Sequence, residues 1–195
     1  AGIAGTHRRA FCAVRPPGHH ATRDTPMGFC LFNSVAAGAA HALETHAFAR
    51  VAIIDFDVHH GNGTQDIFWS DPRVLYASSH QFPLYPGTGA REETGVGNIV
   101  NAPLRPNAGS ADFRKAYEET VLPALEKFAP QLVLISAGFD AHRLDPLANL
   151  ALDAEDYAWV TAKLVDIASR HAQGRVVSSL EGGYSLTALR ESTAA

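Results

Sequence analysis

Short apolar runs, most of them rich in β-branched residues, recur along this chain. Runs of about four to eight such residues predict buried strands. We expect strands at residues 10–14, 51–55, 73–78, 98–102, 131–136 and 175–180. Pro103 limits the hydrogen bonding beside the fourth run, which we therefore place at an edge of the sheet.

Segments with apolar residues at helical spacing alternate with these strands. They lie at residues 35–49, 64–69, 111–128 and 153–174. Asn33 or Ser34 can cap the first of these helices, and Asp153 with Asp156 can form a capping box for the last. Pro123 predicts a kink or a late start in the third helix, because proline lacks the amide proton that the preceding turn would accept.

The polar motifs of the chain stand just after the strands. The alternation of strands and helices predicts an α/β fold in which a mostly parallel sheet carries helices on both faces. The carboxyl ends of the strands in such a sheet share one edge, where loops converge and ligands bind. No repeat or linker interrupts the pattern, so we expect one domain over residues 1–195. The chain begins without Met and stops within a pattern, which suggests a piece of a longer protein.

Composition and charge narrow the class of protein. The chain has 195 residues, 46% of them hydrophobic, which suffices for one α/β core. The formal net charge is −4 and the arginines are dispersed, so we expect no nucleic-acid partner. No apolar run approaches the roughly 20 residues that span a bilayer, and no secretory signal opens the chain. We therefore expect a cytoplasmic enzyme without a membrane partner, in which Cys12 and Cys30 stay reduced.

The segment that follows the second strand carries the strongest chemical signal. Asp55, Asp57 and His59 alternate with other residues, so in an extended chain their side chains point the same way. Two carboxylates and an imidazole that converge behind a buried strand are costly unless a cation offsets their charge. A solvated turn is the alternative, but the second Asp and the adjacent His60 favour a metal site.

Other strands bring compatible groups to the same edge. His19 and His20 follow the first strand on a loop that two prolines and a glycine stiffen. Tyr184 follows the last strand, and Asp140, His142 and Asp145 follow the fifth. The spacing leaves open which of these last three residues would join a metal site. A metal that activates water, a histidine pair that moves protons and a tyrosine that donates to an oxyanion together describe metal-assisted amide hydrolysis.

These motifs resemble a known family. In sequence order they read RPPGHH, GFCLFN, DFDVHHGNGTQ, YPGTG, SAGFDAH with DP, and EGGY. They are similar to those of the zinc-dependent histone deacetylase superfamily, which includes bacterial acetylpolyamine amidohydrolases. The resemblance covers residue 10 to the end and is closest to the class II branch. It implies a three-layer α/β/α fold that arginases share, with the last strand beside the first, then the fifth, second, third and fourth.

The resemblance also implies roles for particular residues. Zinc would bind to Asp57, His59 and Asp145. His19 and His20 would be the tandem catalytic histidines, oriented by Asp55 and Asn62 respectively, and Tyr184 would polarise the substrate carbonyl. Gly28, Phe29 and Tyr85 would line a tunnel for the acyl-lysine chain. Asp55 and Ser78 would border a structural potassium ion, and the protein could form a homo-oligomer. The family domain begins before Ala1 with two further strands, so the chain would be a partial deacetylase catalytic domain.

The predicted reaction is removal of an acetyl or other acyl group from acyl-lysine in proteins or from acylated polyamines. An arginase-like hydrolase is an alternative, but it would need a two-metal cluster with more Asp ligands. A catalytically silent acyl-binding fragment is another alternative. Such a module would have no need of the ligands, the histidine pair and Tyr184 together, and the enzyme is therefore favoured.

Overall fold

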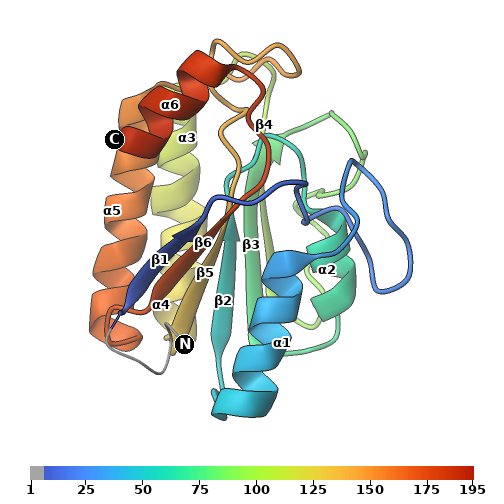
Figure 1. The fold of residues 1–195 in the computed structure, drawn as a ribbon, viewed down its shortest axis with the longest axis vertical. Helices are drawn as coiled ribbons and strands as arrows, with labels where there is room; N and C mark the ends of the chain where they lie inside the picture. Colours follow the sequence, from blue (N-terminus) through green and yellow to red (C-terminus); the bar gives the residue numbers. More distant parts are fainter. Residues whose placement is uncertain (1–6) are drawn as a thin grey trace.

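The strands form one parallel sheet in a computed structural model that describes residues 7–195 (Figure 1). They are β1 (Arg9–Cys12), β2 (Val51–Asp55), β3 (Val74–Gln81), β4 (Ile99–Leu104), β5 (Leu132–Ala137) and β6 (Val176–Leu180). Their order across the sheet is β1-β6-β5-β2-β3-β4, and every neighbouring pair is parallel. The predicted order is therefore confirmed, and the strand that contains Pro103 does lie at an edge.

Helices cover both faces of the sheet, which gives the predicted three layers (Figure 1). One face carries α1 (Ser34–His46) and α2 (Asn62–Phe68). The other face carries α3 (Ser110–Ala116), the π-helical segment η1 (Tyr117–Val121), α4 (Leu122–Phe128) and α5 (Ala154–His171), and α6 (Leu186–Ala194) packs on α5. Within residues 7–195, no helix combines the length and apolarity needed to cross a bilayer.

Two helix boundaries follow from local chemistry. Asn33 caps α1 by accepting a hydrogen bond from the amide of Ala36, and the helix ends at His46 because Ala47 turns to a left-handed conformation with φ 53°. This end comes three residues before the expected residue 49. The irregularity predicted for the third helix is a π-helical turn, η1, which directly precedes α4. Pro123 lies in the first turn of α4, and its ring crowds the turn before it.

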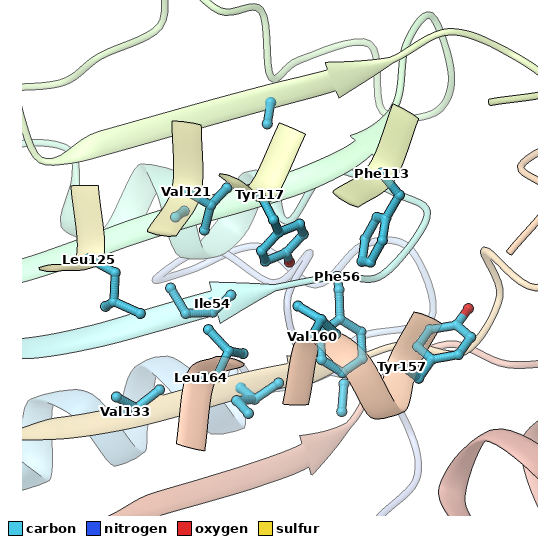
Figure 2. Close-up of a cluster of buried hydrophobic side chains, with 14 of the residues drawn as sticks. Ile54, Phe56, Phe113, Tyr117, Val121, Leu125, Val133, Tyr157, Val160 and Leu164 are labelled. Atoms are coloured by element: carbon cyan, nitrogen blue, oxygen red, sulfur yellow. The ribbon is translucent and has the colours of Figure 1, made fainter. Parts of the chain in front are cut away.

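Alternate residues of each central strand supply the two halves of the core. Ile53 belongs to the cluster under α1, whereas Ile54 belongs to the cluster under η1, α4 and α5. Figure 2 shows Ile54 pointing between Leu125 on α4 and Leu164 on α5. Each of these side chains is fully buried, which stabilises the fold by about 1.5–3 kcal/mol per residue relative to exposure. This packing fixes β2 in the sheet and therefore fixes the position of the polar residues at its end.

Candidate active site

The chain leaves the sheet at Asp55, and carboxylates hold the turn that follows. Oδ1 of Asp55 accepts a hydrogen bond from the amide of Asp57 at 3.1 Å. Oδ1 of Asp57 accepts one from the amide of His59 at 2.9 Å, and Oδ1 of Asp140 accepts one from the amide of Val58 at 2.9 Å. The segment is thus a turn, and the expected extended alternation of Asp55, Asp57 and His59 is wrong. Asp57 and His59 still meet, whereas Asp55 faces His19.

Asp57, His59 and Asp140 form a set of metal-ligand type. One ligand atom from each residue lies within 4.8 Å of the other two. Nδ1 of His59 is 3.1 Å from Oδ1 of Asp57 and 3.1 Å from Oδ2 of Asp140. Burial alone would lower the pKa of His59, but hydrogen bonds to the two carboxylates and their charges raise it to about 10. Burial and the charge of Asp57 raise the pKa of Asp140 to about 7.

Two glycines allow the carboxylates to approach each other. A Cβ atom at Gly138 would lie 2.1 Å from Oδ2 of Asp57, and one at Gly182 would lie 2.1 Å from Oδ2 of Asp140. Any larger residue would displace a carboxylate. The amide of Gly182 also donates to Oδ2 of Asp57 at 2.8 Å. The glycines after β5 and β6 are therefore part of the site.

Asp145, which the family resemblance placed as the third metal ligand, lies outside this set. Its Oδ1 accepts a hydrogen bond from the amide of Leu147 at 3.1 Å. Its Oδ2 accepts hydrogen bonds from the amides of Tyr184 at 2.7 Å and Ser185 at 3.3 Å. Backbone amides thus occupy both oxygens, and the carboxylate anchors a loop. Of the residues that the spacing left open, Asp140 is the one that faces His59.

His19 and His20 lie side by side at the edge of this set, with ring centroids 4.1 Å apart. Nδ1 of His19 is 3.0 Å from Oδ2 of Asp55, and Nδ1 of His20 is 2.8 Å from Oδ1 of Asn62. Burial would lower the pKa of His19, but the charges of Asp55 and Asp57 raise it well above the ordinary value. Burial and the neighbouring charge of His19 lower the pKa of His20 to about 3. One ring is therefore charged and the other neutral.

Glu181 holds the histidine loop in place, and the sequence interpretation did not include it. Its Oε2 accepts hydrogen bonds from the amides of Gly18 at 2.5 Å and His19 at 3.0 Å. The side chain is fully buried, and burial raises its pKa to about 7. The sequence feature that could have indicated this role is the position of the glutamate directly after an apolar strand, because a charge buried there requires partners.

Aromatic side chains surround a small cavity above the histidines. The cavity measures about 50 Å³ and is lined by Pro17, His19, His20, Gly28, Phe29, Asp57, His59, Tyr85, Leu147, Gly182 and Tyr184. The Tyr85 ring is 5.1 Å from that of His20, and the Phe29 ring is 6.3 Å from that of Tyr184. Gly28 has φ +56°, and a Cβ there would lie 2.2 Å from the His20 ring. The expected tunnel residues and Tyr184 thus share one cavity.

Ser78 lies on β3 at the position that pairs with Asp55. It is fully buried, and its Oγ is 2.9 Å from Nδ1 of His80. The hydroxyl of Tyr76 donates to Oδ2 of Asp55 at 3.0 Å. The two side chains expected beside a potassium ion are therefore neighbours in the sheet, and the ion itself stays a prediction.

Known proteins match this chain along nearly its whole length. The family described as Histone deacetylase domain matches residues 2–195. Histone deacetylase 10, chloroplastic, from Oryza sativa subsp. japonica is 46% identical over 188 residues, which are 94% of this chain and 42% of the relative. The histone deacetylase-like amidohydrolase of Pseudomonas aeruginosa is 44% identical over 188 residues, which are 94% of this chain and 50% of the relative.

A solved structure agrees with the fold. The crystal structure of the HDA15 HD domain superposes with a TM-score of 0.90 at 42% identity, and the match covers 96% of this chain and 54% of that one. The chain spans about half the length of each of these three proteins.

Proposed function

Because the chain belongs to the histone deacetylase domain family, we propose that it is a zinc-dependent amidohydrolase that removes acetyl groups from acyl-lysine or from acylated polyamines. The family indicates a hydrolase that acts on acetylated substrates. The observation that carries the finer proposal is the convergence of Asp57, His59 and Asp140. Asp57 and His59 also line one cavity together with the paired histidines. A zinc-dependent amidohydrolase accounts for this combination of residues better than an arginase-like site or an acyl-binding module does.

The residues present fit a zinc ion. Two carboxylate oxygens and one imidazole nitrogen are common zinc ligands, and three protein ligands leave a coordination position open for chemistry. The negative charges of Asp57 and Asp140, which lie close together in a buried place, favour a divalent cation between them. When bound, zinc would polarise the amide carbonyl and lower the pKa of water.

The histidine pair would move the protons. The amide oxygen of Asn62 accepts a hydrogen bond from Nδ1 of His20. Nδ1 therefore carries the ring hydrogen, and Nε2 is free to take a proton from water. Nδ1 of His19 donates to Asp55, and this carboxylate stabilises a proton held on the ring. His20 would thus act as the general base, and a protonated ring of the pair would supply the proton that the leaving amine needs.

Tyr184 and the aromatic rim would recognise the acyl group. Burial and nearby carboxylates raise the pKa of Tyr184, so its hydroxyl keeps the proton that it would donate to the oxyanion. Phe29 and Tyr85 stay 72% and 47% exposed beside the cavity, where two aromatic faces can flank an aliphatic lysine chain. Gly28 leaves room for that chain beside His20.

A structural potassium ion next to Asp55 and Ser78 is the second cofactor that we propose. The two residues are register partners, and both are fully buried. Potassium binds oxygen ligands, which here would be mostly backbone carbonyls. We expect potassium depletion to lower thermal stability, and insensitivity to potassium would remove this ion from the proposal.

The central test is hydrolysis by purified protein in its natural full length. We expect cleavage of a fluorogenic acetyl-lysine amide or of an N-acetylpolyamine, loss of activity with a chelator, and recovery with zinc. Asp24→Asn, an exposed substitution, is the matched control and should change nothing. Hydrolysis that persists after complete metal removal would contradict the proposal. Urea release from a guanidine substrate would favour the arginase-like alternative, and acyl binding without turnover would favour the binding module.

A further inference from the structure

The Tyr184 loop, residues 181–185 between β6 and α6, has no regular secondary structure. Gly182 and Gly183 precede the tyrosine, and Gly183 has φ +129°. Consecutive glycines give a loop great conformational freedom. The proposed function, however, needs the Tyr184 hydroxyl at one place, because an oxyanion donor is effective only when it is preorganised. Other parts of the molecule must therefore restrict this loop.

Arg15 contacts the loop from the segment that precedes the histidine pair. Its Nη2 donates to the carbonyl oxygen of Gly183 at 2.7 Å. Its guanidinium carbon is 5.7 Å from the centroid of the Tyr184 ring, within the range of a cation–π contact. The same side chain thus holds both the backbone before the tyrosine and the ring itself.

Asp145 contacts the loop from the segment that follows β5. Its Oδ2 accepts hydrogen bonds from the amides of Tyr184 at 2.7 Å and Ser185 at 3.3 Å. Charged acceptors form stronger hydrogen bonds than neutral ones, and this carboxylate is only 7% exposed. Arg15 and Asp145 therefore hold the two sides of the Gly183–Tyr184 peptide group with opposite charges, and Asp145 also holds the next peptide group.

We propose that Arg15 and Asp145 are positioning residues that hold the Tyr184 hydroxyl over the cavity. This inference rests on the proposed function, in which Tyr184 donates to the oxyanion. It gives Asp145 a role that differs from metal binding, and it gives Arg15 a role that depends entirely on Tyr184. Both parts can be measured.

Hydrogen–deuterium exchange tests whether Arg15 and Asp145 restrain the Tyr184 loop, and it needs no catalytic turnover. We expect Arg15→Ala and Asp145→Asn to speed exchange of the amides in the Tyr184 loop by about tenfold, since local opening becomes easier. A peptide from β5 should be unchanged. Arg23→Ala is the matched control, because Arg23 is also exposed and donates to a backbone carbonyl, that of Ile67 at 3.2 Å, away from this loop. Unchanged exchange of the loop in both variants would overturn the proposal.

A double-mutant cycle then tests the link to catalysis. Arg15→Ala should lower kcat about tenfold with KM within about twofold, and Arg15→Lys should recover part of the loss because it keeps a charged donor. Tyr184→Phe should lower kcat by roughly 10²–10³. In the Tyr184→Phe background, Arg15→Ala should have no further effect on kcat. An equal loss in both backgrounds would show that Arg15 acts independently and would overturn the proposal.

The two measurements separate this inference from the proposed function. If the protein hydrolyses no acyl amide, the exchange experiment still decides whether Arg15 and Asp145 restrain the loop. If the protein is active and the exchange of the loop is unchanged, only the positioning role fails.

Discussion

The His19–His20 pair and the His60–His80 pair are both buried, with ring centroids 4.1 Å and 4.8 Å apart. Their partners differ. Asp55 contacts one ring of the first pair. Within residues 7–195, the hydrogen-bond partners of the second pair are neutral groups. Burial lowers the pKa of His60 to about 2 and that of His80 to about 4. The first pair therefore contains a charged ring, and the second pair is neutral.

The difference teaches that burial and proximity alone do not give a histidine pair the features that the proposed proton transfer needs. The first pair lines the cavity and has a carboxylate partner that can hold a proton on the ring. The second pair belongs to a hydrogen-bond network that reaches the loop before β4. His60 contacts Thr88 at 2.7 Å and Gln65 at 3.1 Å, and Gln65 donates to Glu93 at 2.5 Å. We infer that the second pair stabilises the loop that carries Tyr85.

The largest expected effect separates the two pairs directly. His20→Ala should lower kcat by about 10²–10⁴, because it removes the proposed general base. KM should change little, since the ring acts on water. His80→Gln is the matched control in the second pair, and its kcat should stay within about threefold of the parent. Steady-state kinetics on an acetyl-lysine amide measure both. Equal losses in the two variants would erase the functional difference between the pairs.

A smaller effect should follow from changing the partner of the first pair. Asp55→Asn keeps the shape of the side chain and removes the charge that stabilises a protonated His19. Loss of an orienting partner of this kind typically costs about 10–100-fold in activity. Asp71→Asn, a surface substitution beside Arg73, is the control. If Asp55→Asn is as active as the parent, the charged partner does not define the catalytic pair.

The smallest expected effect concerns stability and pH. His80 is neutral when folded, with a pKa of about 4, and titrates near 6.5 when unfolded. Between these pH values the unfolded chain binds a proton at His80 that the folded chain does not bind. The free energy of unfolding is therefore highest above pH 6.5 and decreases as the pH falls toward 4. His80→Gln should reduce the slope of unfolding free energy against pH by about one proton in this window. Denaturant titrations at pH 5, 6 and 7 measure the slope, and an unchanged slope would contradict the neutral assignment.

The sequence predicted most of the fold, because burial leaves a clear pattern. The apolar run at 51–54 predicted a buried strand, and the family resemblance supplied the strand order that the sheet confirms. The third residue of the proposed metal site could not be chosen in the same way. Asp140 and Asp145 both follow β5 in a loop, and which carboxylate faces His59 depends on backbone amides from the Tyr184 loop. The role of Glu181 was missed for the same reason, since its partners lie more than 160 residues away.

The zinc content of purified protein tests the central claim most directly. The parent should hold about one zinc ion per chain, measured by plasma mass spectrometry after dialysis. Asp140→Ala should lose most of this zinc, because it removes a carboxylate that faces His59 at 3.1 Å. Asp145→Ala should keep it, because both oxygens of Asp145 accept hydrogen bonds from backbone amides. Retention of zinc by Asp140→Ala together with its loss from Asp145→Ala would contradict the account.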